Sequence, residues 1–322
     1  NTYFIYPNFA VFLRVLRIFV RNNPINWKLR FVQAGSEGGG TDTKPCSSGN
    51  SRGQTAPRGT ASDMGRHKHI HVIRMKKQAL VTGATSGIGR ATALRLAAEG
   101  YDIIATGRRS ERLESLRREI ETAGGRCTTL TFDVRSEEAV RRNLEPLGRV
   151  DLLVNNAGLA AGLEHIDKGD TADWDAMIDT NVKGLLYVTR VITPKMVAAG
   201  GGHVFNIGSI AGTEPYENGA VYCASKHAVH AISQAMRADL LASGIKVTEI
   251  RPGMVETEFS EVRFHGDKER ADRVYDGVEP LTGNDIAEAI AWAAQLPAHM
   301  TVNEMVLMPS QQAGAYYTHR KN

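Results

Sequence analysis

The sequence predicts an α/β fold, in which a single doubly wound parallel sheet of about seven strands carries helices on both faces. Short apolar segments alternate with amphipathic helical segments from Gln78 onward. The apolar segments lack a polar side, as expected of parallel strands that helices cover on both faces. A glycine-rich turn, Gly83–Gly89, joins the first strand to the first helix. Such regular alternation predicts one open sheet with crossover helices.

Length and composition narrow the class of protein. The 322 residues suffice for one large domain or two ordinary ones, and 42% hydrophobic with 23% charged residues is typical of a globular protein. The net charge of +4 is unevenly spread, because residues 1–75 hold 11 of the 39 basic but only 3 of the 35 acidic residues. The rest of the chain is net negative, which gives no electrostatic case for nucleic-acid binding.

Residues 1–74 read as a leader. The apolar run Phe9–Val20 is broken by arginines, so its uncharged pieces fall short of the ~20 residues that span a bilayer. A surface-lying amphipathic helix and an arginine-rich transit peptide are both open alternatives. Residues 34–63 are low in complexity and cannot bury a core. Met75 directly precedes the first expected strand, as the initiating methionine of a protein commonly does. We therefore interpret residues 1–74 as upstream or non-native sequence, mostly disordered, and residues 75–322 as the folded domain.

The three cysteines, Cys46, Cys127 and Cys223, have neither metal-site nor disulfide spacing. We read them as free thiols in a reducing compartment, which favours the cytoplasm. Cys223 is either a redox switch or, as we prefer, simply a small helix residue.

The glycine-rich turn follows a buried strand, Ala79–Thr82, and precedes a helix expected over Arg90–Glu99. Backbone N–H groups at such a helix start bind a pyrophosphate, and glycines allow its close approach. The expected contacts are Gly83, Thr85, Ser86, Gly87, Ile88 and Gly89.

The second strand, Asp102–Thr106, ends in Gly107 followed by Arg108 and Arg109. A site for NAD would place an acid here to hold the ribose 2′-hydroxyl. Arginines instead suit the 2′-phosphate of NADP, so the sequence favours NADP. The alternative is that both arginines merely begin the helix Ser110–Ala123.

Later elements continue the pattern: strand Cys127–Phe132, helix Ser136–Leu144, strand Val150–Val154, a helix around Asp173–Ala199, helix Asn284–Gln295 and strand Glu304–Met308. Asp133 and Val134 follow the third strand, where an acid can bond the adenine edge. Asn155, Ala157 and Gly158 follow the fourth. An asparagine there suggests amides that tie strands together, or backbone lining a cofactor cleft.

Ser209, Tyr222 and Lys226 carry the candidate chemistry. A tyrosine phenol titrates near pH ~10, so alone it is a poor base at neutral pH. A lysine four residues later lies on the same helix face and would stabilise the phenolate. The serine hydroxyl would bond a substrate oxygen.

These motifs together resemble the short-chain dehydrogenases/reductases, from about Met75 to Pro309. The resemblance rests on Thr82-Gly83-x-x-x-Gly87-x-Gly89, Asn155-Asn156-Ala157-Gly158, Asn181, Ser209, Tyr222-x-x-x-Lys226 and Pro252-Gly253. It implies a Rossmann-like fold and a catalytic tetrad of Asn181, Ser209, Tyr222 and Lys226. It also implies that Pro252, Gly253, Val255 and Thr257 grip the nicotinamide, that no metal is needed, and that the protein is a homotetramer.

A closer resemblance is to bacterial NADP-dependent 3-hydroxy acid dehydrogenases, also described as serine/allo-threonine dehydrogenases or malonic semialdehyde reductases. It rests on Ala105–Arg109, Met177–Asn181, Glu261–Asp267 and Leu296–His299. It implies oxidation of L-serine, L-allo-threonine or 3-hydroxyisobutyrate, or reduction of the matching semialdehydes. The alternatives are a sepiapterin-like or aldehyde reductase of broader range, and a nucleotide-sensing regulator without turnover.

Substrates of this kind carry a carboxylate that needs a partner once desolvated. Arg263 is the candidate anchor, a lone arginine between Val262 and Phe264. The alternative is a salt bridge from Arg263 to Glu261 or Asp267.

Overall fold

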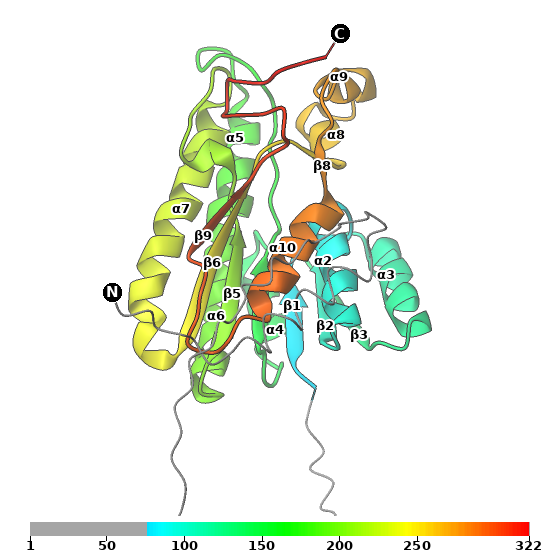
Figure 1. Ribbon diagram of the computed structural model, residues 1–322, viewed down its shortest axis with the longest axis vertical. Coiled ribbons are helices and arrows are strands. Elements are labelled where there is room, and N and C mark those ends of the chain that lie inside the picture. Colours follow the sequence, from blue (N-terminus) through cyan, green and yellow to red (C-terminus); the bar gives the residue numbers. More distant parts are fainter. Residues whose placement is uncertain (1–75, 322) are drawn as a thin grey trace, which may run out of the picture. The chain divides into compact units, whose positions relative to one another are not determined.

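The computed structural model describes residues 76–321 (Figure 1). The expected leader lies outside the described residues. A seven-stranded, wholly parallel sheet has the strand order β3-β2-β1-β4-β5-β6-β9. Its strands are β1 Gln78–Val81, β2 Asp102–Gly107, β3 Cys127–Thr131, β4 Leu152–Asn155, β5 Gly202–Ile207, β6 Ile245–Pro252 and β9 Glu304–Leu307. The predicted doubly wound sheet is therefore confirmed.

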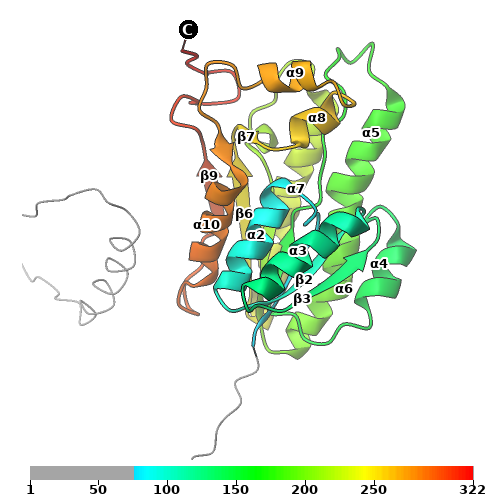
Figure 2. The same cartoon turned by 90° about the vertical axis from the view of Figure 1, so that its right-hand side faces the viewer.

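Both faces of the sheet are buried. Ala79 and Val81 of β1 pack in one apolar cluster, whereas Leu80 between them packs in another on the opposite face. The first cluster is covered by α2 (Gly87–Ala98), α3 (Ser110–Thr122) and α10 (Gly283–Ala294), and the second by α4 (Glu137–Leu144), α6 (Leu185–Ala198) and α7 (Ala220–Leu240) (Figure 2). Burial on both sides explains why the strands are apolar throughout.

The prediction of a single helix over Asp173–Ala199 was wrong in one respect. Helix α5, Thr171–Ile178, passes into a π-helical segment, η1, at Asp179–Gly184, before α6 begins at Leu185. A π turn inserts one extra residue into the helical path and is frequent at functional sites. This segment contains the buried Asn181. The other expected elements begin and end within a few residues of the observed ones.

A small cap stands above the carboxyl ends of the strands (Figure 1). It consists of β7 (Val255–Glu256), α8 (Phe259–Arg263), α9 (Lys268–Arg273) and β8 (Leu281–Thr282), with β7 and β8 paired in parallel. Short 3₁₀ turns, η2 (Ile210–Gly212) and η3 (Leu241–Ser243), flank α7. Within residues 76–321, no helix is long and apolar enough to traverse a bilayer.

Candidate active site

A cleft of about 540 Å³ opens at the carboxyl ends of the strands. Its walls come from the segments that follow β1, β2, β4, β5 and β6, and from the cap. In the sheet, β1 lies between β2 and β4, so the chain order reverses at this point. Open α/β sheets bind their ligands at such a reversal, outside the carboxyl ends of the strands.

The segment after β4 holds the glycine-rich turn in place. The Oγ1 atom of Thr82 accepts hydrogen bonds from the backbone N–H groups of Asn156 and Ala157, each at 3.0 Å. The Asn156 side-chain amide donates to the Thr82 carbonyl at 2.9 Å. A Cβ at Gly89 would lie only 2.4 Å from both Asn156 Nδ2 and the Gly83 carbonyl oxygen. Glycine at this position therefore lets the first turn of α2 reach the cleft, where its free N–H groups suit a pyrophosphate.

Most of the predicted cofactor-binding residues line the cleft. They are Gly83, Thr85, Ser86, Gly87, Ile88, Arg108, Arg109, Ala157, Gly158, Tyr222, Lys226, Pro252, Gly253, Val255 and Thr257. The donor set, glycine turn and arginines together, therefore fits a phosphorylated dinucleotide.

Four predicted cofactor residues lie outside the lining: Gly89, Asp133, Val134 and Asn155. The Asp133 carboxylate accepts a hydrogen bond from Arg135 at 2.7 Å, and Val134 packs in the core. The Asn155 amide donates to Asn206 of β5 at 2.9 Å. Asn155 therefore ties two neighbouring strands together, one of the two roles that the sequence suggested for it.

Arg109 lines the cleft beside the glycine-rich turn, and each of its side-chain nitrogens has a hydrogen-bond partner. Its Nη2 atom donates to Thr85 Oγ1 and Ser86 Oγ, each at 2.9 Å. Its Nη1 atom pairs with Glu258 of the cap at 2.8 Å, and Arg112 pairs with the same carboxylate. Two hydroxyls and a guanidinium converge here, which is a donor set that suits a phosphate.

The candidate catalytic groups meet deep in the cleft. Tyr222 and Lys226 stand one turn apart on α7, and each is less than a tenth exposed. Ser209 follows β5 and caps η2, its Oγ accepting from the Ala211 N–H at 3.1 Å. The Lys226 ammonium donates to the Ile207 carbonyl at 2.9 Å and lies 5.9 Å from the Tyr222 ring centre.

Burial dominates the acid–base properties of these groups. It raises the pKa of Tyr222 well above its usual value, while a hydrogen bond to Ser209 and the charge of Arg263 pull that pKa down. Burial also lowers the pKa of Lys226 to about 8. The net pKa of Tyr222 is thus raised, because desolvation of the phenolate outweighs the charges around it, and the stabilisation of the phenolate by Lys226 stays a prediction.

Asn181 lies behind the catalytic pair. Its side chain accepts from the Leu159 N–H and donates to the Leu159 carbonyl, each at 2.8 Å, and also donates to Ser225 Oγ at 2.9 Å. The π-helical segment is thus hydrogen-bonded to the backbone of Leu159, which lines the cleft. Asn181 itself does not line the cleft, so its place in the catalytic tetrad stays a prediction.

Arg263 projects from the end of α8 into the cleft. Its Nε atom donates to the Gly162 carbonyl at 3.2 Å, and its guanidinium carbon lies 5.5 Å from the Tyr216 ring centre. Within residues 76–321 its buried Nη2 atom has no hydrogen-bond partner. The alternative salt bridge is wrong, since no carboxylate in this range pairs with Arg263, and Asp267 instead caps α9.

Several lining residues carry no motif and were missed, among them Tyr216, Glu258, Phe259 and Tyr275. Phe259 packs edge-on against Tyr222, with ring centres 5.7 Å apart. Tyr275 donates to the Val255 carbonyl at 3.0 Å and so braces the cap. A sequence pattern could have indicated only Glu258, as an acid beside the expected nicotinamide segment.

Comparison with known proteins agrees with this geometry. A family model described as short chain dehydrogenase matches residues 77–268. The NADP-dependent 3-hydroxy acid dehydrogenase YdfG of Salmonella typhi is 47% identical over 241 residues, covering 73% of this chain and 96% of that protein. Sulfoacetaldehyde reductase 2 of Chromohalobacter salexigens is 46% identical over 239 residues, covering 73% and 94%.

A solved structure described as the closed form of serine dehydrogenase complexed with NADP+ superposes with a TM-score of 0.71. It is 43% identical in sequence and covers 76% of this chain and 99% of that one.

Proposed function

Because this chain belongs to the short-chain dehydrogenase family and is an NADP-dependent oxidoreductase acting on CH–OH groups, we propose that its substrates are small 3-hydroxy acids. L-serine, L-allo-threonine and 3-hydroxyisobutyrate, or the matching semialdehydes, are the specific candidates. We propose that residues 75–322 form the catalytic domain that acts on these substrates.

Tyr222 is the proposed general acid/base. Its phenol removes the proton from the substrate hydroxyl in oxidation and returns it in reduction. Ser209 lines the same cleft as Tyr222, and its hydroxyl holds the substrate oxygen for this transfer. When bound, NADP exchanges hydride directly with the substrate carbon and, in its oxidised form, adds a positive ring to the site.

Lys226 is the proposed partner of Tyr222. Its ammonium lies 5.9 Å from the phenol ring and stabilises negative charge on it. The fixed contact to the Ile207 carbonyl keeps that ammonium at the inner wall of the cleft. Asn181 supports the arrangement by fixing Leu159 on the same wall.

The observation that carries the substrate class is Arg263. The Arg263 guanidinium lines the cleft beside the Tyr222 ring, and one of its buried nitrogens has no hydrogen-bond partner among residues 76–321. Burying such a group is costly unless an anion pairs with it. A substrate carboxylate attached two bonds from the reacting carbon would complete this pairing while its hydroxyl reaches Tyr222.

A second candidate is a small aldehyde carrying a sulfonate. Sulfoacetaldehyde has an anion two bonds from its reacting carbon, as a 3-hydroxy acid does, and a relative of 46% identity is named for that compound. Arg263 would bind either anion. A broader aldehyde or sepiapterin-like reductase would not need the unpartnered guanidinium.

A homotetramer in the cytoplasm is also proposed, from the family resemblance. Exposed apolar side chains at the β9 edge of the sheet, Val306 on β9 and Trp292 on α10, support a self-association surface. Light scattering of the purified protein tests the assembly.

The test of the substrate class is initial rates with NADP against L-serine, L-allo-threonine, 3-hydroxyisobutyrate and neutral secondary alcohols, and with NADPH against sulfoacetaldehyde. We expect turnover of the carboxylated compounds at low concentration and poor turnover of neutral alcohols. Turnover of neutral alcohols alone would overturn the proposal, and selective turnover of sulfoacetaldehyde would favour the second candidate.

A further inference from the structure

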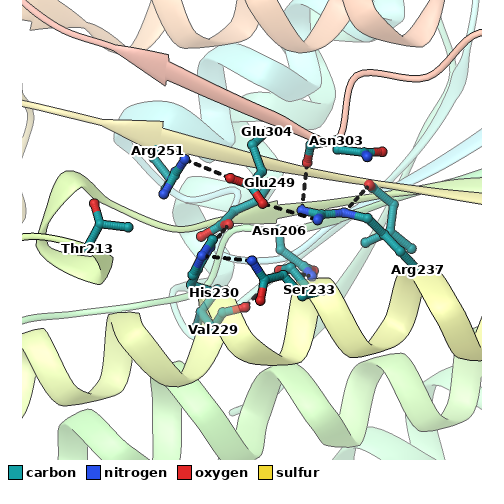
Figure 3. Close-up of polar contacts among 12 residues, drawn as sticks. Asn206, Thr213, Val229, His230, Ser233, Arg237, Glu249, Arg251, Asn303 and Glu304 are labelled. Atoms are coloured by element: carbon teal, nitrogen blue, oxygen red, sulfur yellow. Dashed lines mark hydrogen bonds and ion pairs between the residues drawn. The ribbon is translucent and has the colours of Figure 1, made fainter.

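A buried carboxylate lies behind the catalytic lysine, in a part of the molecule that the proposed mechanism does not use. Glu249 stands in the middle of β6, and its side chain is fully buried. It belongs to a polar cluster between β6, β9 and α7, where Figure 3 places it close to His230, Arg251 and Glu304. Acidic side chains are almost never fully buried without a partner, so the position of Glu249 needs a physical reason.

Two contacts locate the Glu249 carboxylate. Its Oε2 atom lies 2.6 Å from Nδ1 of His230. The Gln234 amide nitrogen lies 3.1 Å from the other ring nitrogen, Nε2. His230 is therefore the hydrogen-bond partner of one carboxylate oxygen of Glu249.

The second carboxylate oxygen, Oε1, has no hydrogen-bond partner among residues 76–321. It lies against Gly208, where a Cβ would be only 2.4 Å from it. Gly208 is therefore required by the close approach of Glu249, and it directly precedes Ser209. The unpartnered oxygen thus reaches the end of β5, from which the catalytic serine is placed.

The other charges of the cluster compensate one another. Glu304 pairs with Arg237 at 3.1 Å and with Arg251 at 2.8 Å. The ligand atoms of His230, Glu249 and Glu304 lie within 4.8 Å of one another. Two arginines bonded to one of the three groups would, however, repel a metal cation. An electrostatic role for Glu249 is therefore favoured over a metal site.

Lys226 approaches the same end of β5 from α7. Its ammonium donates to the carbonyl of Ile207, the residue next to Gly208, at 2.9 Å. Burial lowers the pKa of Lys226 to about 8, whereas the charge of Glu249 raises it. The charged side chains and histidines on the elements around Glu249 are Lys226, His227, His230, Arg237 and Asp239 on α7, Lys246 and Arg251 on β6, and Glu304 on β9. Among the carboxylates, Glu249 is the one whose charge supports the Lys226 ammonium.

We propose that Glu249 is a positioning residue for hydride transfer, because its buried carboxylate keeps Lys226 in the ammonium form that the reaction needs. This inference rests on the roles proposed above for Tyr222 and Lys226. Glu249 touches neither substrate nor cofactor, and it acts only through the lysine. It therefore governs the pH range of activity rather than substrate affinity.

The test is the pH profile of kcat/KM for Glu249→Gln, whose amide oxygen can still accept from His230. Wild-type activity should fall as the pH rises and Lys226 loses its proton. In the variant this fall of kcat/KM at alkaline pH, the alkaline limb of the profile, should occur at a pH lower by about half a unit or more. The loss relative to wild type should then grow from less than about twofold at pH 7 to about threefold at pH 9. An unmoved limb in a folded variant would overturn the proposal.

Two matched variants separate charge from packing. Glu304→Gln removes a carboxylate from the same cluster and should leave the alkaline loss of activity at its wild-type pH. Glu249→Asp keeps the charge, so its alkaline loss of activity should lie close to the wild-type pH. An equal shift in Glu304→Gln would contradict the assignment to Glu249. If Glu249→Gln does not fold, the apolar double variant Glu249→Leu with His230→Leu leaves no unpaired partner and should show the same shift.

Failure of this inference and failure of the proposed function are distinguishable. If the proposed function is wrong, wild-type protein will not turn over hydroxy acids with NADP, and Tyr222→Phe will remain active. If only the role of Glu249 is wrong, both of those results hold and the alkaline limb stays where it is in Glu249→Gln.

Discussion

The guanidinium carbon of Arg263 lies 5.8 Å from the centre of the Tyr222 ring, although the two residues come from different helices. A cationic donor and the proposed proton donor therefore face one small space. The distance suits a substrate whose anionic group and reacting carbon are separated by a single carbon atom. Tyr222 supplies the proposed proton transfer, and the nearby Arg263 relates that reaction to substrates that carry an anion.

Replacement of Tyr222 by Phe should remove the proton transfer and leave the shape of the cleft intact. General acid–base catalysis contributes about 10²–10⁴-fold, so kcat should fall by about that amount. NADPH affinity, followed by its fluorescence, should stay within about twofold of wild type. Tyr216→Phe is the matched control, since it alters a neighbouring phenol that has no proposed role in proton transfer. A Tyr222→Phe enzyme with near-normal turnover would refute the mechanism.

The sheet and the Gly83–Gly89 turn were predictable because their signals are local. A strand covered on both faces must be apolar at every position, and a phosphate-binding turn needs glycine at particular positions. That Arg263 pairs with no carboxylate among residues 76–321 was not predictable, because the nearness of Glu261 and Asp267 in the sequence does not show whether either one contacts it. The π segment around Asn181 and the contact of Glu249 with Gly208 likewise depend on packing between distant elements.

Arg109→Gln should weaken NADP binding selectively. The guanidinium meets two hydroxyls at the expected 2′-phosphate position, and a hydrogen bond to a charged group is worth about 1.5–3 kcal/mol. The KM for NADP should therefore rise at least about tenfold, while the KM for NAD changes little. Arg112→Gln is the matched control, because Arg112 pairs with the same Glu258 carboxylate and does not line the main cleft. Equal effects on both cofactors would assign Arg109 a structural role instead.

His203 should make the fold sensitive to acid. Burial lowers the pKa of this histidine to about 3 from the 6.5 of an exposed one. Between these values the unfolded chain binds a proton that the folded chain does not, so stability falls as the pH drops from about 6.5 toward about 3. The slope from this one group approaches about 1.4 kcal/mol per pH unit. Urea unfolding of His203→Gln, which can still donate to Thr248, should show a shallower decline, and an identical decline would exclude His203.

Gly89→Ala should destabilise the nucleotide half. The added Cβ would lie 2.4 Å from the Gly83 carbonyl oxygen, a backbone atom that cannot simply rotate away. Overpacking of this kind costs about 1–3 kcal/mol. Urea unfolding should show that loss, accompanied by weaker NADPH binding. Gly148→Ala is the control, because nothing lies within 4 Å of its Cβ, and it should be close to neutral. Similar stabilities for the two variants would contradict the close packing at Gly89.

The most direct measurement is kcat/KM of Arg263→Met for a pair of substrates, 3-hydroxybutyrate and 2-butanol, in which a methyl group replaces the carboxylate. Arg270→Met, an arginine of the same cap that stacks on Phe264, is the matched control. If Arg263 binds the substrate anion, kcat/KM for the acid should fall by about 10²-fold while the value for the neutral alcohol is unchanged. An equal loss on both substrates, or no loss on the acid, would contradict the assignment of this enzyme to 3-hydroxy acids through Arg263.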